Sequence, residues 1–228
     1  MKTFAIGDIH GRIEALKEVL HNSKFDYQKD KLIILGDICD GGYNTYEVIE
    51  ELLKIKNKIL ILGNHDCWFM NNISSGWAEE IWTSQGGNNT IQSYKNKPVP
   101  ITHQEFLNSG KFYHVEKGMI FVHGGYKPKI PLEENTQETL TWDRELINLA
   151  RFQPIHATYQ NKKFIPKKVF IGHTTTQTYG KTEPIKFNNL IMIDCGAGWN
   201  GKLCLMNIKT EQTWLSQTQT PGGRNESL

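Results

Sequence analysis

Short apolar runs recur along the first third of the chain, and each run ends in a glycine that is followed by a polar side chain. The three glycines are Gly7, Gly36 and Gly63. Continuous apolar runs of this length predict strands that are buried on both faces, as in a parallel sheet. The predicted strands cover residues 3–6, 32–35 and 59–62.

The segments between these runs carry apolar residues at intervals of three and four, which is typical of one face of a helix. These residues are Ile13, Leu16, Val19 and Leu20 in the first segment, and Tyr46, Ile49, Leu52 and Leu53 in the second. The alternation predicts a βαβαβ unit and an α/β architecture. Ligands of such sheets bind outside the carboxyl ends of the strands, so we expect Asp8, Asp37 and Asn64 to share one crevice.

The pattern changes in residues 67–117, which are rich in tryptophan and in turn-forming residues. Thr102 and Glu105 have the spacing of a capping box and predict a short helix that ends near Leu107. We interpret 67–117 as an insertion near the site. Two roles stay open for it: a lid or substrate wall, or an aromatic subdomain without a direct function.

The second half of the chain returns to strand patterns and predicts a second sheet. The expected strands cover 119–122, 168–171, 190–193 and 203–208. The turn-like residues 198–201 join the last two of these strands. We expect one domain over residues 1–216 and a flexible, solvated tail over 217–228.

Charge and length narrow the class of protein. The 228 residues include 26 Lys and Arg against 24 Asp and Glu, which argues against dedicated nucleic-acid binding or membrane-surface binding. The sequence has no apolar run of about 18 residues, and its start lacks the pattern of a signal peptide, so we expect a cytoplasmic protein without a membrane partner. The cysteines lack metal-type spacing and are assigned to packing. They are Cys39, Cys67, Cys195 and Cys204.

Side chains that can bind a metal follow five of the predicted strands. They are Asp8, His10, Asp37, Asn64, His123 and His173. Mixed oxygen and imidazole donors suit Mn²⁺, Fe or Zn²⁺, whereas a structural zinc site would use thiolates. Glycines beside these residues allow a close backbone approach at the turns. The remaining histidines lack this setting and are assigned no role: His21, His103, His114 and His156.

This ordered series of motifs resembles the calcineurin-like metallophosphoesterases, and within them the phosphoprotein phosphatase branch found in bacterial and phage serine/threonine phosphatases. The motifs are Gly7-Asp8-Ile9-His10-Gly11, Gly36-Asp37-Ile38-Cys39-Asp40-Gly41, Gly63-Asn64-His65-Asp66, His123-Gly124-Gly125 and Gly172-His173. The resemblance extends over about residues 1–215. It implies a fold in which two mixed β-sheets are sandwiched between helices (α/β/β/α).

The resemblance also implies roles for individual residues. Asp8 and His10 would bind a first metal, Asp37 would bridge two metals, and Asn64, His123 and His173 would complete the second. Two bridged cations, Mn²⁺ being the first choice, clamp phosphate oxygens and lower the pKa of a shared water, and the resulting hydroxide attacks phosphorus in line.

Three further residues are implied in acid catalysis and phosphate binding. His65 matches the general acid of the family, and Asp40 matches the residue that orients it. Arg144 is the candidate for phosphate binding, because an arginine is expected after the His123 motif and its planar fork suits phosphate oxygens. Arg12 is a weaker candidate for the same role.

Two positions depart from the family pattern. Gly41 stands where the second motif usually has an arginine, so one phosphate contact is missing. Asp66 replaces the usual glutamate of the third motif, which is a mild change. The Gly41 departure weakens the case for a phosphoprotein substrate.

Three functions are compatible with these patterns. The first is a two-metal phosphomonoesterase, most simply a serine/threonine protein phosphatase. The alternative is hydrolysis of dinucleoside polyphosphates, such as diadenosine tetraphosphate, or of other small phosphoesters, with the tryptophan-rich segment stacking a nucleobase. The third is a binding module that kept the fold and lost catalysis.

Overall fold

A computed structural model describes residues 1–95 and 97–217. Within them the chain forms two five-stranded mixed sheets and a small hairpin. The first sheet has the strand order β12-β11-β1-β2-β3, with β1 at Thr3–Ile6, β2 at Lys31–Ile34, β3 at Asn57–Leu60, β11 at Cys204–Asn207 and β12 at Thr213–Leu215. Of the predicted tail at 217–228, all but Gln217 lies outside the described residues.

The second sheet also has five strands. Its order is β4-β5-β8-β10-β9, with β4 at Tyr113–Glu116, β5 at Met119–Val122, β8 at Lys168–Ile171, β9 at Ile185–Phe187 and β10 at Leu190–Met192. The hairpin pairs β6 (Ala157–Tyr159) with β7 (Lys162–Phe164). The helices are α1 (Ile13–Asn22), α2 (Thr45–Leu53), α3 (Asn64–Ser75), α4 (Glu80–Trp82), α5 (Asn88–Ser93), α6 (Ile101–Asn108), α7 (Gln137–Trp142) and α8 (Glu145–Ala150).

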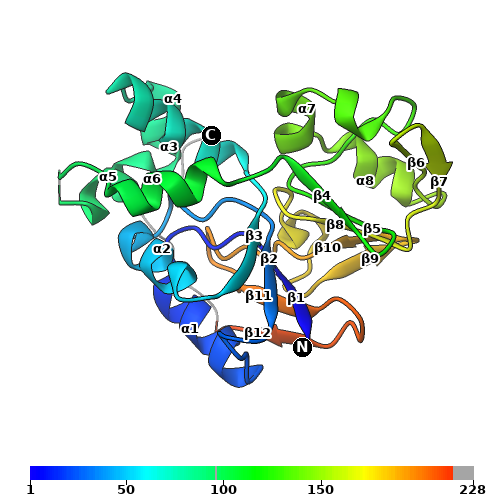
Figure 1. The fold of residues 1–228 in the computed structure, drawn as a ribbon, viewed down its shortest axis with the longest axis horizontal. Coiled ribbons are helices and arrows are strands. Elements are labelled where there is room, and N and C mark those ends of the chain that lie inside the picture. The colour runs from blue at the N-terminus through cyan, green and yellow to red at the C-terminus, as the bar shows by residue number, and fades with distance from the viewer. Residues whose placement is uncertain (96, 218–228) are drawn as a thin grey trace.

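The molecule consists of four layers, because each sheet packs on the other and is covered by helices on its outer face. Figure 1 shows α1 and α2 beside the first sheet and α7 and α8 beside the second. In β1, Phe4 and Ile6 belong to the core under the helices, whereas Ala5 belongs to the core between the sheets. Successive side chains of a strand point to opposite faces, so both cores need an uninterrupted apolar run. The predicted α/β/β/α fold is therefore confirmed.

Most of the predicted elements are present within two residues of their expected ends. The parallel pairing of β1 with β2 and of β2 with β3 confirms the βαβαβ unit. The run 203–208 does not join the second sheet: β11 crosses back and pairs antiparallel with β1. Because both sheets are buried, an apolar run does not reveal which of them it enters.

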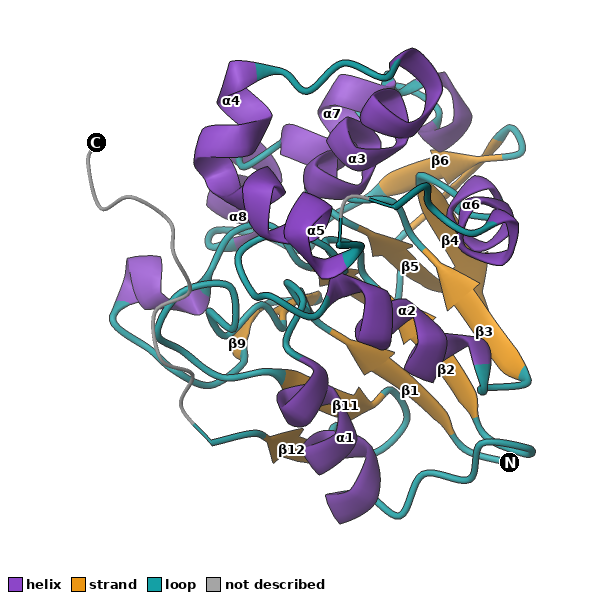
Figure 2. Ribbon diagram, turned by 90° about the vertical axis from the view of Figure 1, so that its left-hand side faces the viewer, coloured by secondary structure: helices purple, strands orange, loops and turns teal. Residues whose placement is uncertain are grey.

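The segment 67–117 is more regular than its composition suggests. It contains the end of α3, the helices α4, α5 and α6, and the edge strand β4. Figure 2 shows α3, α4 and α5 grouped together at one end of the molecule. The predicted helix near Leu107 is present, but the capping box is wrong: α6 starts after Pro100, and Thr102 lies inside its first turn. Across the described residues, every helix is too short or too polar to cross a membrane.

Candidate active site

The proposed metal-binding side chains all follow strands that run parallel within their own sheet. β1, β2 and β3 are parallel in the first sheet, and β5, β8 and β10 are parallel in the second. The carboxyl ends of such strands form one crevice. The structure places there Asp8 and His10 after β1, Asp37 after β2, Asn64 after β3, His123 after β5 and His173 after β8.

Asp37 lies between two groups of possible ligand atoms. Within each group the atoms lie within 4.8 Å of one another, and the groups are Asp8, His10 and Asp37 on one side and Asp37, His123 and His173 on the other. Oδ1 of Asn64 lies 3.1 Å from Nε2 of His123. The structure thus brings together all six residues that the sequence singled out, with Asp37 common to both groups.

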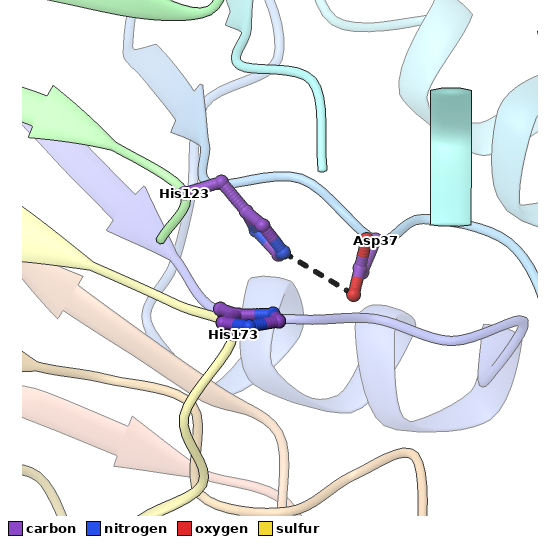
Figure 3. Close-up of side chains that lie close together, drawn as sticks. All are labelled: Asp37, His123 and His173. Carbon is purple, nitrogen blue, oxygen red and sulfur yellow. Dashed lines mark ion pairs between the residues drawn. The ribbon is translucent and has the colours of Figure 1, made fainter. Parts of the chain in front are cut away.

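The imidazole rings of His10 and His123 are held by backbone carbonyl groups. Nδ1 of His10 donates to the Cys39 carbonyl (3.0 Å), and Nδ1 of His123 donates to the Leu35 carbonyl (2.6 Å). Their Nε2 atoms lie 3.8 Å and 3.3 Å from Oδ2 of Asp37. Figure 3 shows the His123 ring directed at Asp37, with His173 beside it. When a histidine binds a metal through one ring nitrogen, a hydrogen bond from its other ring nitrogen orients the ring in this way.

The loops that carry these residues adopt a backbone conformation that costs free energy. Positive φ angles occur at His10 (49°), Asp37 (47°), Asp40 (68°) and His173 (60°). Each costs about 1–3 kcal/mol and persists only where the surroundings fix it. The Asp66 carboxylate supplies part of this restraint, because it accepts hydrogen bonds from the amides of Asp37 (2.8 Å), Ile38 (3.0 Å) and Gly63 (3.0 Å). Asp66 therefore joins the turns after β2 and β3.

Charges within the crevice shift several pKa values. Burial, and after it the negative charge of Asp194, raises the pKa of the Asp8 carboxyl well above its usual range. Burial alone would lower the pKa of His123, but the Asp37 and Asp8 carboxylates outweigh it and raise that pKa to about 10. Burial and the His123 charge lower the pKa of His173 to about 3. Because a coordinating imidazole must be neutral, a cation bound by His123 would displace its proton.

Two unpaired atoms in the crevice fit a bound cation. Oδ1 of Asp8 and Nε2 of His173 are buried and have no hydrogen-bond partner within the described chain. A buried polar atom left in this way costs about 1–3 kcal/mol, and coordination to a cation would remove that cost. Carboxylate, amide and imidazole donors together suit Mn²⁺, Fe or Zn²⁺. The residues present therefore fit divalent cations.

His65 and Asp40 form a buried pair beside this cluster. Nδ1 of His65 lies 2.7 Å from Oδ2 of Asp40, and the Asp40 side chain is fully buried. The amide of His65 donates to Oδ1 of Asp37 (3.0 Å). A Cβ on Gly63 would overlap that same Asp37 oxygen, so the close approach requires glycine. The pair has the geometry that the sequence motifs predict.

A cavity of about 390 Å³ opens over the crevice. Its wall includes Trp68 and Trp142, whose rings meet edge to face with centroids 5.3 Å apart. Arg144 lines the same cavity, whereas Nε of Arg12 donates to the Ala197 carbonyl (3.1 Å). The cavity is lined by His10, Asp37, Asn64, His65, Trp68, Ile81, Gln85, Trp142, Arg144, His173, Thr174, Thr175, Thr178, Asp194 and Trp199.

Sequence reasoning assigned no role to two parts of this lining. Asp194 follows β10 as Asp37 follows β2, so the strand-end pattern that found the other carboxylates was present for it too. Trp142 and Trp199 are about two-fifths exposed (39% and 42%) at the cavity. Neither tryptophan follows an apolar strand pattern, so the sequence gives no comparable signal for them.

Comparison with known proteins identifies the family. A model of calcineurin-like phosphoesterases matches residues 1–193. The chain belongs to this family. It is thus a metal-dependent phosphoesterase, the enzyme class that the resemblance implied.

Relatives and solved structures extend the comparison over most of the chain. A symmetrical bis(5'-nucleosyl)-tetraphosphatase of Pseudomonas fluorescens is 22% identical over 97% of this chain and 96% of its own. A crystal structure provisionally described as a diadenosine tetraphosphatase has a TM-score of 0.67 at 15% identity, covering 97% of this chain and 93% of its own. A serine/threonine phosphatase of Saccharomyces cerevisiae has a TM-score of 0.59 at 14% identity, over 96% and 80%. The two structural matches support the fold.

In this calcineurin-like phosphoesterase, Gly41 stands where the family motif usually has an arginine, and Gly86 packs against it. Gly86, in a π-helical turn at Thr83–Gly87, packs so closely that a Cβ on it would overlap the Gly41 nitrogen. Gly86 has a φ of 104°, which side chains rarely adopt. The segment after α4 therefore lies directly on the turn that carries Asp40.

We predict that Gly86→Ala destabilises the protein, because the added methyl group meets backbone atoms and the φ angle becomes strained. The expected loss in free energy of unfolding is about 2–4 kcal/mol, measured by denaturant titration. Gly76→Ala is the matched control: Gly76 has a φ of 70° but nothing within 4 Å of the added atom. Equal losses in the two variants would show that the Gly86 contact has no steric role.

Proposed function

We propose that this phosphoesterase hydrolyses dinucleoside tetraphosphates, which was the alternative hypothesis of the sequence analysis. The supporting observation is that tetraphosphatase relatives align along nearly the whole of both chains, as the Pseudomonas protein does. The cavity agrees with this choice, because it places aromatic side chains beside the proposed phosphate site. Cleavage would be symmetrical, as the names of these relatives state, and would yield two nucleoside diphosphates.

The tryptophans of the cavity would bind the nucleoside part of the substrate. Trp68 contacts the ring of His65, and Trp142 contacts the ring of His173, with centroids 5.0 Å and 5.4 Å apart. Trp199 lines the cavity as well and is partly exposed. Stacking of a base on an aromatic face contributes about 1–3 kcal/mol. A nucleotide whose base stacks here would have its phosphates near the metal-binding residues.

Two divalent cations, with Mn²⁺ as the first choice, complete the proposed site. Asp8 and His10 would hold one, Asn64, His123 and His173 would hold the other, and Asp37 would contact both. When bound, such a pair polarises phosphate oxygens and lowers the pKa of water. The protein's part is to fix these ligands on the ends of rigid strands, and the carbonyl groups that hold His10 and His123 serve that purpose.

His65 would supply the proton that the departing oxygen needs. Nδ1 of His65 is bonded to Asp40, and His65 lines the cavity in which the substrate would bind. Asp40, whose side chain is fully buried, would thus hold the ring of His65 in one orientation.

Arg144 would bind a phosphate group of the substrate. It lines the cavity, and its positive charge is one of the causes of the low pKa of His173. We predict that Arg144→Ala lowers kcat/KM by about 10–100-fold, because a charged hydrogen bond to phosphate is lost. Steady-state kinetics on diadenosine tetraphosphate measures this. Arg151→Ala, an exposed arginine just after α8, serves as the control. A change of less than about twofold in Arg144→Ala would assign phosphate binding to another residue.

A serine/threonine protein phosphatase is the second candidate, and one observation favours it. The His65–Asp40 pair suits an alkoxide leaving group, which must be protonated, better than it suits a nucleoside diphosphate. The relatives named tetraphosphatases favour the dinucleotide instead.

Product analysis tests the proposed function. Mn²⁺-loaded protein is incubated with diadenosine tetraphosphate, and the nucleotides are separated by ion-exchange chromatography, with a chelator-treated sample as the control. The proposal predicts ADP as the main product in the loaded sample only. Unchanged dinucleotide, under conditions in which the protein hydrolyses p-nitrophenyl phosphate, would contradict it.

A further inference from the structure

The carboxylate of Asp40 is held by two side chains from a distant part of the sequence. Oγ1 of Thr90 donates to Oδ1 of Asp40 (2.6 Å), and Nε1 of Trp82 donates to Oδ2 (2.8 Å). Oδ2 is the same oxygen that contacts Nδ1 of His65 (2.7 Å). Both oxygens therefore have a donor from the segment 80–93, in addition to the imidazole.

Trp82 and Thr90 are themselves firmly fixed. Trp82 is 1% exposed and stacks on the ring of Phe69, with centroids 6.2 Å apart and ring planes inclined by 22°. Thr90 is fully buried, and its hydroxyl oxygen also accepts a hydrogen bond from the amide of Asp40 (2.9 Å). It lies 3.1 Å from the hydroxyl of Thr45 at the start of α2. The donors to Asp40 thus belong to a packed layer.

The backbone next to Asp40 is held by the same segment. Nδ2 of Asn89 donates to the Gly41 carbonyl (2.6 Å), and Gly86 packs against the Gly41 nitrogen. A side chain at Gly86 would overlap this turn. The segment 80–93 therefore contacts the main chain and the side chain of the turn that carries Asp40.

We propose that Trp82 and Thr90 are positioning residues for His65 that act through Asp40. The inference rests on the proposed acid role of His65. It also assigns a role to residues 80–93, which are part of the segment whose role the sequence left open. The two donors supply hydrogen bonds to both oxygens of a fully buried carboxylate, and burying these oxygens without partners would be costly. They also fix the direction from which Oδ2 meets Nδ1 of His65, and a small misplacement of a catalytic group lowers the rate steeply.

Substrates with different leaving groups show whether Trp82 and Thr90 position an acid or only support the fold. Phenyl phosphate releases a basic phenoxide that benefits from protonation, whereas p-nitrophenyl phosphate releases an anion that needs little. Trp82→Phe keeps an aromatic ring and removes the N–H, and Thr90→Val keeps the shape and removes the hydroxyl. We expect kcat on phenyl phosphate to fall by about 10-fold in each, and kcat on p-nitrophenyl phosphate to change by less than about twofold.

Two comparisons complete the experiment. Trp77→Phe is the control, because Trp77 belongs to the same part of the chain but is 72% exposed. Asp40→Asn is combined with Trp82→Phe in a double-mutant cycle, measured on Mn²⁺-loaded protein with phenyl phosphate. If Trp82 acts through Asp40, the second substitution lowers kcat little once the first is present.

The outcomes separate this inference from the proposed function. Equal losses on both substrates, or additive effects with Asp40→Asn, would overturn the positioning role. If Trp82→Phe does not fold, Thr90→Val decides the question alone. A leaving-group effect in His65→Asn without one in Trp82→Phe and Thr90→Val would overturn the inference and leave the acid role standing. No leaving-group effect in His65→Asn would overturn both.

Discussion

Asp37→Asn is expected to abolish phosphoester hydrolysis and to lower the metal content of the purified protein. Asp37 is the residue shared by both groups of ligand atoms, so the substitution weakens both proposed cation positions at once. We expect kcat/KM to fall by at least about 10³-fold, which corresponds to about 4 kcal/mol of transition-state stabilisation. Kinetics on p-nitrophenyl phosphate and metal analysis by mass spectrometry measure the two effects.

The fold should tolerate this substitution. An asparagine can still accept the hydrogen bond that the His65 amide donates to Oδ1 of Asp37. Glu14→Gln removes an exposed carboxylate from α1 and serves as the control for loss of charge. Two tightly bound cations and normal turnover in Asp37→Asn would refute the proposed bridging role.

His65→Asn should leave the metal content unchanged and slow the reaction only where the leaving group needs a proton. The expected decrease in kcat on phenyl phosphate is about 10²–10⁴-fold, because general acid catalysis contributes about that much. On p-nitrophenyl phosphate the decrease should be much smaller. The measurement is the ratio of kcat values for the two substrates at saturating concentration.

His21→Asn is the matched control for this prediction, because His21 is exposed in the last turn of α1 and belongs to none of the motifs. Its ratio of kcat values should equal that of the unsubstituted protein. An unchanged ratio in His65→Asn would mean that another group, or water, supplies the proton.

The proposed metal-binding residues could be predicted from the sequence because they follow the ends of buried strands. A buried strand must be apolar, and the first polar residues after it stand out, as Asp8 and Asp37 do. Glycines mark the same turns, because Gly63 approaches Asp37 too closely for any side chain. The parallel β1, β2 and β3 then bring these residues together without further information.

The contacts across the cavity could not be predicted in the same way. Trp142, at the end of α7, and Trp199, in a turn before β11, reach the cavity from segments that sequence patterns do not place relative to the strands. The bond from Trp82 to Asp40 joins residues 42 positions apart and depends on how the segment 80–93 packs against the turn that carries Asp40. The edge strands β4, β9 and β12 were missed because their residues are partly buried or exposed and do not form the continuous apolar runs that mark the buried strands.

The start of a helix is another place where the local sequence pattern and the structure differ. The spacing of Thr102 and Glu105 satisfies a capping box, yet Pro100 precedes the first helical residue and its ring fixes the backbone there. His103, which was assigned no chemistry, is fully buried and bonds to Tyr94 and Glu50.

The ratio of kcat/KM for diadenosine tetraphosphate to that for a phosphothreonine peptide tests the central claim most directly. Both are measured with Mn²⁺-loaded protein, at equal substrate concentrations and with a chelated sample as the control. We predict that the dinucleotide is preferred by at least about tenfold, since tryptophan stacking of about 1–3 kcal/mol is available to its bases. A tenfold preference for the peptide would contradict the proposed substrate and make the protein a phosphoprotein phosphatase.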